Sequence, residues 1–525
     1  MDASSFVSWF LLTVLAVAVL TFLLFCCYVK YTHMRFDHIP GPPRESFLFG
    51  HLPLIMRIMK KNELFYDQAL EWAEKYGPVM RLNFIQRPVI VVSSPEGVKE
   101  FLMSPKYKKD KFYEKIFSLF GVRFLGSGLV TAQDYDHWHK QRRIMDPAFN
   151  RTYLMNLMGP FNEKAEELME ILAEKADGHE GVKMHEMMNR LTLDVIAKVA
   201  FGLELNALHD DSTPFPRAIT VVMKGMIEVR NPLSQYMPGK QAFVKEVRES
   251  LMLLRRTGKE CLEQRQKAIE NGEDIPTDIL TQILKGAELE GDYDVESMLD
   301  NFVTFFIAGH ETTANQLSFL ILELTRHPEI LKKLQAEIDE VIGSKVNVDY
   351  SDLGKLQYLS QTLKEVLRLY PTAPGTSRLL EDELVIEGIR IPADVPVILN
   401  AYIMGRMDKY FKDPLTFDPD RFHPDAPKPY FTYFPFSLGP RSCIGQAFSQ
   451  CIALLLLYLR LHLGLKSPGE QSMMEAKVVM VKLLQRFEFQ LVPGQSFKIV
   501  DMGTLRTVDG VICTLRPRTS RKGSE

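Results

Sequence analysis

Apolar residues recur at helical spacing along most of this chain and alternate at strand spacing in only a few short stretches. This periodicity predicts helices over 65–76, 155–176, 184–202, 241–270, 297–326, 328–342 and 356–370. Two hairpins are expected, one from 78–84 with 88–92 and one from 384–392 with 395–399. The polar, glycine-bearing segment 271–294 is expected to be a surface loop. The pattern therefore predicts a mainly α fold with small β-sheets.

The N-terminal stretch differs in kind from the rest of the chain. Residues 3–29 contain no charged side chain and are rich in Leu, Val and Phe. A helix of this length crosses a hydrocarbon core of about 30 Å. A cleaved signal peptide is the alternative, but it has a basic start and a shorter apolar core, whereas Asp2 opens this segment. We expect residues 1–29 to be a retained transmembrane anchor with a cytoplasmic body, because basic residues follow the span: Lys30, Arg35 and Arg44.

The segments after the anchor predict one large domain. Residues 30–45 include the run His38-Ile-Pro-Gly-Pro-Pro43, a stiff stretch that suits a linker and hinge. Residues 46–515 contain no low-complexity linker and no internal repeat, which indicates a single domain above the usual size. Residues 516–525 form a polar tail that we expect to be disordered.

The overall composition narrows the class of protein. The chain has 525 residues, of which 46% are hydrophobic, enough for a large core. Its net charge of −3 gives no reason to expect a nucleic-acid partner. Its six cysteines show no disulfide-framework spacing, which favours a reducing compartment.

The strongest chemical signal is the run Phe436-Ser-Leu-Gly-Pro-Arg441-Ser-Cys443-Ile-Gly445. A cysteine binds a metal as its thiolate, and a helix that begins directly after Cys443 is expected to lower the pKa of its thiol. No second Cys or His lies within zinc spacing, which argues against a zinc or iron–sulfur site, whereas a single thiolate suits haem iron. The alternative is that Cys443 is a buried structural thiol.

This run resembles the haem-binding loop of the cytochrome P-450 family, Phe-x-x-Gly-x-Arg-x-Cys-x-Gly, at every fixed position. The resemblance implies the cytochrome P-450 fold and a haem b (iron protoporphyrin IX) that Phe436 and Arg441 contact and Cys443 ligates. It further implies a monooxygenase of the endoplasmic reticulum membrane that uses O2. Its electrons would come from NADPH through a separate partner, NADPH–cytochrome P-450 reductase. The one Gly-x-Gly in the chain, 126–128, lacks the rest of a dinucleotide site, which agrees with an external reductase.

A second motif lies in the middle of the predicted helix 297–326, in the run Ala308-Gly309-His-Glu311-Thr312. A helical glycine costs about 1 kcal/mol relative to alanine, so its presence calls for a reason. A missing side chain at Gly309 would let a flat ligand approach the helix, and Thr312 could bond a carbonyl one turn back. The alternative is a packing glycine beside a capping-type threonine. The run resembles the family's (Ala/Gly)-Gly-x-(Asp/Glu)-Thr motif, which implies that Ala308 and Gly309 border the haem and that Glu311 and Thr312 relay protons to oxygen.

Charged residues provide further matches to the family. From spacing alone, Glu365 and Arg368 would be a surface ion pair worth a few tenths of a kcal/mol, roughly. The resemblance instead implies a buried structural pair joined by Arg421 of the segment 417–422. Haem propionates need cationic partners, and arginine suits carboxylates well. The family's haem-contact motif and propionate ligands are matched by Trp138, Arg142, Arg378 and Arg441.

The substrate follows from resemblance and not from spacing. The stretches 138–144, 300–309, 356–361 and 430–439 resemble sterol side-chain hydroxylases of the family. They imply a sterol substrate, with hydroxylation of cholesterol at side-chain C24 as the leading expectation. Three alternatives stay open: a monooxygenase of another lipid, a haem isomerase or dehydratase, and a haem or sterol binder without turnover.

One segment departs from the family pattern. The helix after the cysteine is expected to continue as Phe-(Ala/Ser)-x-x-Glu-x-Lys, but Glu475 and Lys477 follow only after an apolar insertion at 451–473. The leucine-rich part of the insertion is short for a membrane span. We interpret it as a retained intron or gene-model error, or as a variant that folds poorly. The alternative is that it extends the post-cysteine helix and then rejoins the core.

Overall fold

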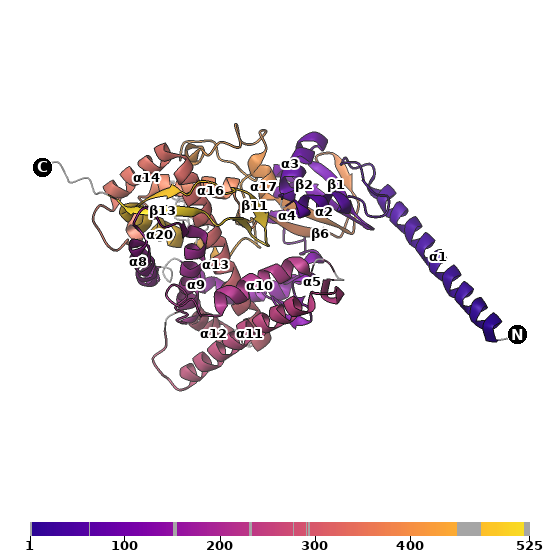
Figure 1. Ribbon diagram of the computed structural model, residues 1–525, viewed down its shortest axis with the longest axis horizontal. Helices are drawn as coiled ribbons and strands as arrows, with labels where there is room; N and C mark the ends of the chain where they lie inside the picture. The colour runs from indigo at the N-terminus through magenta and orange to yellow at the C-terminus, as the bar shows by residue number, and fades with distance from the viewer. Residues whose placement is uncertain are drawn as a thin grey trace.

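The structure is a computed structural model that describes residues 3–518 apart from 62, 151–154, 230, 232–233, 277, 290, 292–293 and 449–473. The insertion at 451–473 and residues 519–525 of the polar tail therefore lie outside the described residues. The chain forms a broad body from which the first helix projects on one side (Figure 1).

Helices make up most of the body, as the sequence predicts. Those that position the site are α3 (Phe65–Tyr76), α6 (Tyr135–Met145), α8 (Met158–Glu174), α9 (Met184–Phe201), α10 (Phe215–Glu228), α11 (Gln241–Glu270), α12 (Ile279–Leu289), α13 (Val295–Arg326), α14 (Pro328–Val341), α16 (Gln357–Leu369), α17 (Ala401–Arg406), α18 (Gly445–Phe448) and α20 (Met474–Arg486). The shorter ones are α2 (Leu52–Lys60), α4 (Pro95–Met103), α5 (Phe112–Lys115), η1 (Asp146–Phe149), η2 (Ser234–Tyr236), α15 (Tyr350–Leu353) and η3 (Pro419–Phe422). All seven predicted helices are confirmed, two of them with the predicted bounds, α3 and α11.

The strands form one four-stranded sheet and several small ones, which confirms the fold class. The sheet has the order β1-β2-β9-β6, from β1 (Val79–Phe84), β2 (Arg87–Val92), β6 (Gly375–Leu380) and β9 (Val395–Asn400). The other strands are β3 (Ser118–Leu119), β4 (Val122–Arg123), β5 (Val182–Lys183), β7 (Leu384–Ile386), β8 (Ile389–Ile391), β10 (Phe487–Leu491), β11 (Ile499–Asp501), β12 (Leu505–Thr507) and β13 (Ile512–Pro517).

The first predicted hairpin is confirmed and the second is wrong. β1 and β2 pair antiparallel over their whole length. In the second region, β7 pairs with β8, and β9 pairs with β6 and β2 instead. The reason is a tight turn at Glu387 and Gly388, where both residues have positive φ (49° and 74°) and reverse the chain inside the segment read as one strand.

The predicted surface loop 271–294 is also wrong, because it contains helix α12. Five apolar side chains of α12 are buried at helical spacing: Ile279, Leu280, Ile283, Leu284 and Ala287. Gly286 lies close to α6, since a Cβ there would come 3.1 Å from the carbonyl oxygen of Ile144. The polar residues on either side and this glycine are typical of a loop, so the short amphipathic pattern of α12 was not recognised in the sequence.

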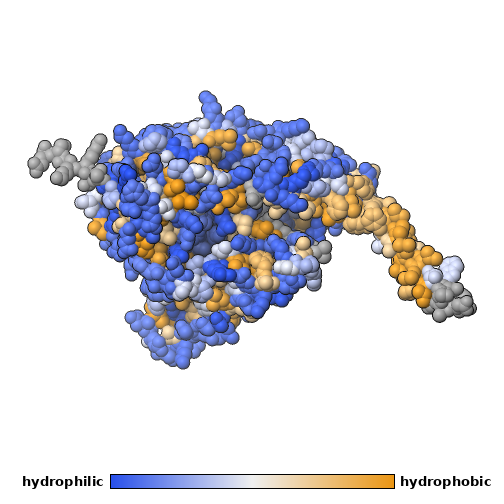
Figure 2. Space-filling view, in the orientation of Figure 1, coloured by the Kyte–Doolittle hydropathy of each residue, from blue (hydrophilic) through white to orange (hydrophobic). Residues whose placement is uncertain are grey.

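Helix α1 (Ala3–Phe36) projects from the body, and the projecting part is mostly hydrophobic (Figure 2). Residues Val7–Phe36 are long and apolar enough to cross a membrane. The helix ends at Phe36, past the predicted anchor end at residue 29, and Phe36 and Ile39 are buried in the body. The proline-glycine stretch docks on the sheet, because the amide of Arg81 donates to the carbonyl oxygen of Pro40 at 2.8 Å.

Helix α13 runs through the middle of the body behind α9 (Figure 1). Most of its side chains are buried, which explains why its sequence is apolar on most faces. Helix α20 is equally enclosed, with every side chain from Met474 to Leu484 buried. Its two lysines keep partners there, since Lys477 Nζ donates to the carbonyl of Leu353 and Lys482 Nζ to Glu166.

Candidate active site

A cavity of about 370 Å³ lies between α13 and the loop that carries Cys443. Its wall has contributions from α6, α9, α13, α16, β6 and the start of α20. Eight of the predicted site residues line it: Trp138, Arg142, Ala308, Gly309, Thr312, Phe436, Arg441 and Cys443. The structure thus brings together residues from three separate parts of the sequence.

The Cys443 loop is held in one conformation by its backbone. The amide of Cys443 donates to the carbonyl of Phe436 at 2.9 Å, and the amide of Gln446 donates to the carbonyl of Cys443 at 3.1 Å. Gly439 has φ +67°, and a Cβ there would lie 2.1 Å from the carbonyl oxygen of Leu102. No other residue type fits this position, so the glycine lets the loop pack against α4.

The helix predicted after Cys443 is confirmed as α18, but the expected lowering of the thiol pKa is not found. Burial raises the pKa of Cys443, although backbone N–H groups of Gly445 and Gln446 and the charge of Arg142 oppose that rise. The thiol is open to the cavity, yet protein atoms surround it closely enough for desolvation to dominate. The helix N-terminus acts in the predicted direction but is the weaker effect.

Cationic side chains gather at one end of the cavity. Arg142 Nη1 donates to the carbonyl of Ser442 at 2.6 Å, and the Arg441 guanidinium lies 4.5 Å from the ring centre of Trp138. Burial, with Arg378 nearby, lowers the pKa of Arg441 to about 10. Arg378 is itself buried and lies behind the cavity wall rather than on it. Its Nη1 donates to Thr376 Oγ1 at 2.9 Å.

Sequence reasoning missed Lys109, Tyr113 and Glu475, which also line the cavity. Lys109 Nζ lies 4.2 Å from the ring centre of Tyr113, whose hydroxyl is 3.1 Å from Thr376 Oγ1. Burial lowers the pKa of Lys109. In the sequence Lys109 lies among other lysines that together suggest a solvated basic surface, so only the fold shows that Lys109 lines the cavity. Glu475 was identified as the displaced glutamate of the family pattern, but that pattern did not indicate that it lines the cavity.

The α13 motif, residues 308–312, has features of both interpretations, a motif that borders a ligand and a motif that packs helices. Thr312 Oγ1 donates to the carbonyl of Ala308 at 2.9 Å, as predicted. Gly309 lines the cavity, but a Cβ there would lie 2.7 Å from Ile196 Cδ1 of α9. Close packing of α9 on α13 therefore requires the glycine, which supports the packing interpretation, and the haem contact of Gly309 stays a prediction. His310 is buried, and its Nδ1 lies 3.0 Å from the carbonyl oxygen of Phe306.

Glu311 does not line the cavity with its neighbours. Its carboxylate is 5% exposed and faces the turn between β11 and β12. Thr504 Oγ1 donates to Glu311 Oε2 at 3.4 Å, and Asn315 Nδ2 donates to the same oxygen at 3.5 Å. The two residues of the predicted relay thus share a helix but face different surroundings.

Glu365 and Arg368 form a buried pair, so the surface interpretation from spacing is wrong. Arg368 Nε and Nη2 each donate to one oxygen of Glu365 at 2.7 Å. The remaining Arg368 donors reach backbone carbonyls, those of Gly405 at 2.6 Å and Pro414 at 2.7 Å. Arg421 Nε approaches Glu365 Oε1 at 3.4 Å. This network ties α16 to the segment that leads to the Cys443 loop.

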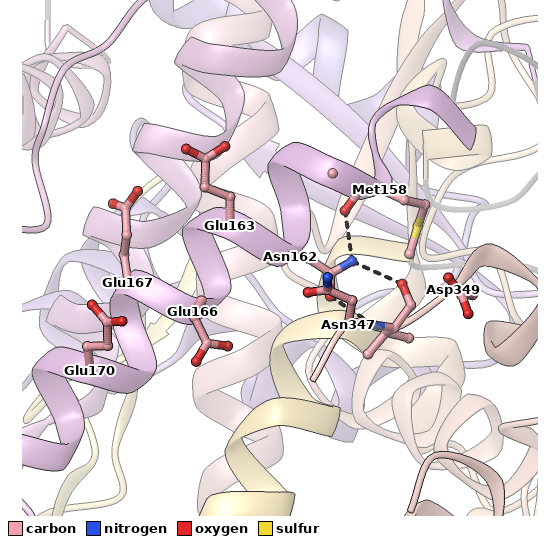
Figure 3. Close-up of a pocket in the computed structure, with 10 residues that line it drawn as sticks. Met158, Asn162, Glu163, Glu166, Glu167, Glu170, Asn347 and Asp349 are labelled. Carbon is pink, nitrogen blue, oxygen red and sulfur yellow. Dashed lines mark hydrogen bonds between the residues drawn. The ribbon is translucent and has the colours of Figure 1, made fainter. Parts of the chain in front are cut away.

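A second hollow, of about 540 Å³, lies beside α8 and is lined by acidic side chains (Figure 3). Glu166 accepts from Lys482 at 2.8 Å and pairs with Arg486 at 2.6 Å. Asn162 bridges the carbonyls of Met158 and Val348 (Figure 3). These bonds explain Glu166 and Asn162 as structural residues on a solvated face, and we assign no chemistry to the hollow.

The comparisons with known proteins agree with this geometry. The family model described as Cytochrome P450 matches residues 40–462. The chain belongs to the cytochrome P450 family. As a cytochrome P450 it is a monooxygenase family member that depends on haem iron, O2 and electrons from a redox partner. The family match ends inside the insertion at 451–473.

Curated cytochrome P450 proteins are similar to this one over most of both chains. Cytochrome P450 4d2 of Drosophila melanogaster is 29% identical over 91% of this chain and 94% of its own. Protein LUTEIN DEFICIENT 5, chloroplastic, of Arabidopsis thaliana is 28% identical over 87% of this chain and 75% of its own. Cytochrome P450 3A7 of Homo sapiens is 26% identical over 92% of this chain and 91% of its own.

The residues around the cavity fit the haem that the cytochrome P450 family uses. Among the described residues, Cys443 is the cysteine that lines the cavity, and its sulfur could ligate the iron. Lys109, Arg142 and Arg441 provide the positive charge that two propionates require. Ala308 gives the α13 wall a small side chain, which suits a flat ring.

Proposed function

We propose that this cytochrome P450 is a membrane-anchored monooxygenase that hydroxylates a sterol, with cholesterol at side-chain C24 as the preferred substrate. The observation that carries the proposal is that Cys443, Ala308, Gly309 and Thr312 line the same largely apolar cavity. A bound haem supplies oxygen activation there. The sterol assignment is supported by the sequence resemblance to sterol side-chain hydroxylases and by the apolar part of the wall, which includes Phe149, Ile196, Phe305 and Leu367.

The roles proposed for the side chains follow from where they lie. With haem bound, Cys443 would ligate the iron as its thiolate, and Phe436 would contact the haem. Trp138, Arg142 and Arg441 would hold the propionates, while Arg378 would add positive charge from behind the wall. Thr312 holds a proton on Oγ1 at the cavity surface, bonded to the carbonyl of Ala308. Glu311 supplies protons to this region from the buried side of α13.

The location proposed is the endoplasmic reticulum membrane, crossed once, with the catalytic body in the cytoplasm. The support is the helix Val7–Phe36, whose most apolar stretch is not buried in the body, and the basic residues that follow this stretch. We propose residues 1–29 as the anchor and 46–515 as the monooxygenase domain. An NADPH–cytochrome P-450 reductase held by the same membrane then delivers the electrons.

The experiment that tests the proposed function is product analysis in a reconstituted system. The full chain is combined with the reductase, NADPH and cholesterol in lipid vesicles, and products are identified by mass spectrometry. The proposal expects a hydroxycholesterol with the oxygen on side-chain C24. NADPH-dependent hydroxylation of another lipid, with cholesterol untouched, would overturn the sterol assignment and leave the monooxygenase class standing. Haem and sterol binding without NADPH-dependent product would overturn both.

A further inference from the structure

The carboxylate of Glu311 is held by two donors that come from different elements. Thr504 Oγ1 and Asn315 Nδ2 both donate to Glu311 Oε2, and Asn315 Nδ2 also donates to Thr504 Oγ1 at 3.0 Å. All three side chains are buried, with exposures of 5% for Glu311, 0% for Asn315 and 7% for Thr504. Two donors on one oxygen fix the direction in which a carboxylate points.

The orientation of Asn315 is fixed in turn by His185 at the start of α9. His185 Nε2 lies 2.8 Å from Asn315 Oδ1, and since that oxygen can only accept, Nε2 carries the hydrogen. Burial lowers the pKa of His185, which keeps the ring neutral and the other nitrogen free to accept from Asn189 Nδ2 at 3.1 Å. With its oxygen occupied, the Asn315 amide must present Nδ2 to Glu311.

Thr504 stands in the turn of the β11–β12 hairpin, and this turn touches the cavity wall. The amide of Leu505 donates to the carbonyl of Thr372 at 3.0 Å, and Thr372 lines the cavity. Gly503 has φ +93°, and a Cβ there would lie 2.0 Å from Met226 Cε of α10. The hairpin is therefore packed between α10, the wall residue Thr372 and the carboxylate of Glu311.

We propose that Thr504 is a positioning residue for Glu311. Through Thr504, the β11–β12 hairpin controls the amount of hydroxylated product formed per NADPH consumed. The inference rests on the proton-supplying role proposed above for Glu311. A substrate that contacts and displaces Thr372 or α10 would also displace the β11–β12 turn, which carries the Thr504 hydroxyl. Thr504 need not touch substrate or haem, because it acts by holding the Glu311 carboxylate in place.

The test compares haem-loaded full chains carrying Thr504→Val, Thr504→Ser, Glu311→Gln or the control Thr507→Val. Thr507 is a buried threonine of the same hairpin whose hydroxyl has no hydrogen-bond partner among the described residues. The first measurement is product formed per NADPH consumed. The second is the orientation of the Glu311 side chain in crystal structures, which does not depend on turnover.

The expected result is a roughly two- to tenfold drop in product per NADPH for Thr504→Val, the range for one lost hydrogen bond. Thr504→Ser should restore the ratio, Thr507→Val should leave it unchanged, and the Glu311 carboxylate should turn away only in Thr504→Val. If Thr504→Val fails to bind haem, Thr504→Ala replaces it with the same expectations. An unchanged ratio with an unmoved carboxylate overturns the positioning role. If Glu311→Gln also leaves the ratio unchanged, the proposed proton supply fails as well, and that result separates the two failures.

Discussion

Arg142 Nη1 donates a 2.6 Å hydrogen bond to the carbonyl oxygen of Ser442, the residue next to Cys443. The same guanidinium donates through Nε to Asp146 Oδ1 at 2.6 Å. One side chain of α6 therefore holds the cysteine loop and faces the cavity at the same time. The planar guanidinium of Arg142 binds Ser442 and Asp146 through separate N–H donors, and the single ammonium group of a lysine cannot reproduce this geometry.

We predict that Arg142→Lys lowers haem retention while leaving the fold intact. The loss of a charge-assisted bond of about 1.5–3 kcal/mol corresponds to roughly ten- to hundredfold weaker retention. Haem transfer to apomyoglobin measures this directly. The matched control is Arg256→Lys, an arginine of α11 that is 69% exposed, which should transfer haem at the unaltered rate. Equal transfer rates for the two variants would contradict the bridging role.

Glu365→Gln is predicted to destabilise the whole domain rather than to alter chemistry. It leaves the fully buried Arg368 guanidinium without its countercharge, which costs about 3–5 kcal/mol for a broken buried pair. Denaturant unfolding followed by circular dichroism measures the change. Glu263→Gln, which breaks a surface pair with Lys259, should cost roughly 0–1 kcal/mol. Similar costs for both variants would show that the buried pair is dispensable.

Glu475 gives a pH-dependent prediction. Burial raises the pKa of its carboxyl to about 8, and Oε1 has no hydrogen-bond partner in the described part of the chain. Because the folded-state pKa is raised, the stabilisation is complete below the unfolded pKa and is lost as pH rises towards 8. Between pH 6 and pH 8 the unaltered chain should lose about 2 kcal/mol relative to Glu475→Gln. Parallel stability curves for the two proteins over this range would contradict the assignment.

The insertion at 451–473 is tested by removing it. Helix α18 is described up to Phe448, and α20 is described from Met474 onward with its side chains buried, so the described core contains the residues that continue the family pattern. We expect the deletion of 451–473 to raise haem content per chain and turnover. The full chain and the deletion are expressed together, and haem is measured by the pyridine haemochrome spectrum. Equal haem content and equal turnover would show that the insertion is harmless.

Periodicity predicted the long helices because their buried faces repeat over many turns, as in α11 and α13. It failed where one short feature decided the structure, as at the Glu387–Gly388 turn and in α12. Strand partners also escaped prediction, because β9 pairs with β6 and β2 across long stretches of sequence.

Much of the cavity wall was predictable because the Cys443 loop, the α13 motif and the Trp138–Arg142 pair are local patterns. Lys109 and Tyr113 were not, since only the fold brings α5 and the residues before it to the cavity. The direction of Glu311 was equally hidden, because it depends on Thr504, far along the chain. The pKa of Cys443 was misjudged because burial outweighs the helix N-terminus.

The reduced carbon monoxide difference spectrum shows whether Cys443 is the sulfur ligand of a haem. The unaltered chain and Cys261→Ala, which removes a buried thiol remote in sequence, should both show the thiolate-type band. Cys443→Ala should lose that band, whether or not haem is retained, because no other cysteine lines the cavity among the described residues. A thiolate-type band that survives in Cys443→Ala would show that Cys443 is not the ligand of the haem iron.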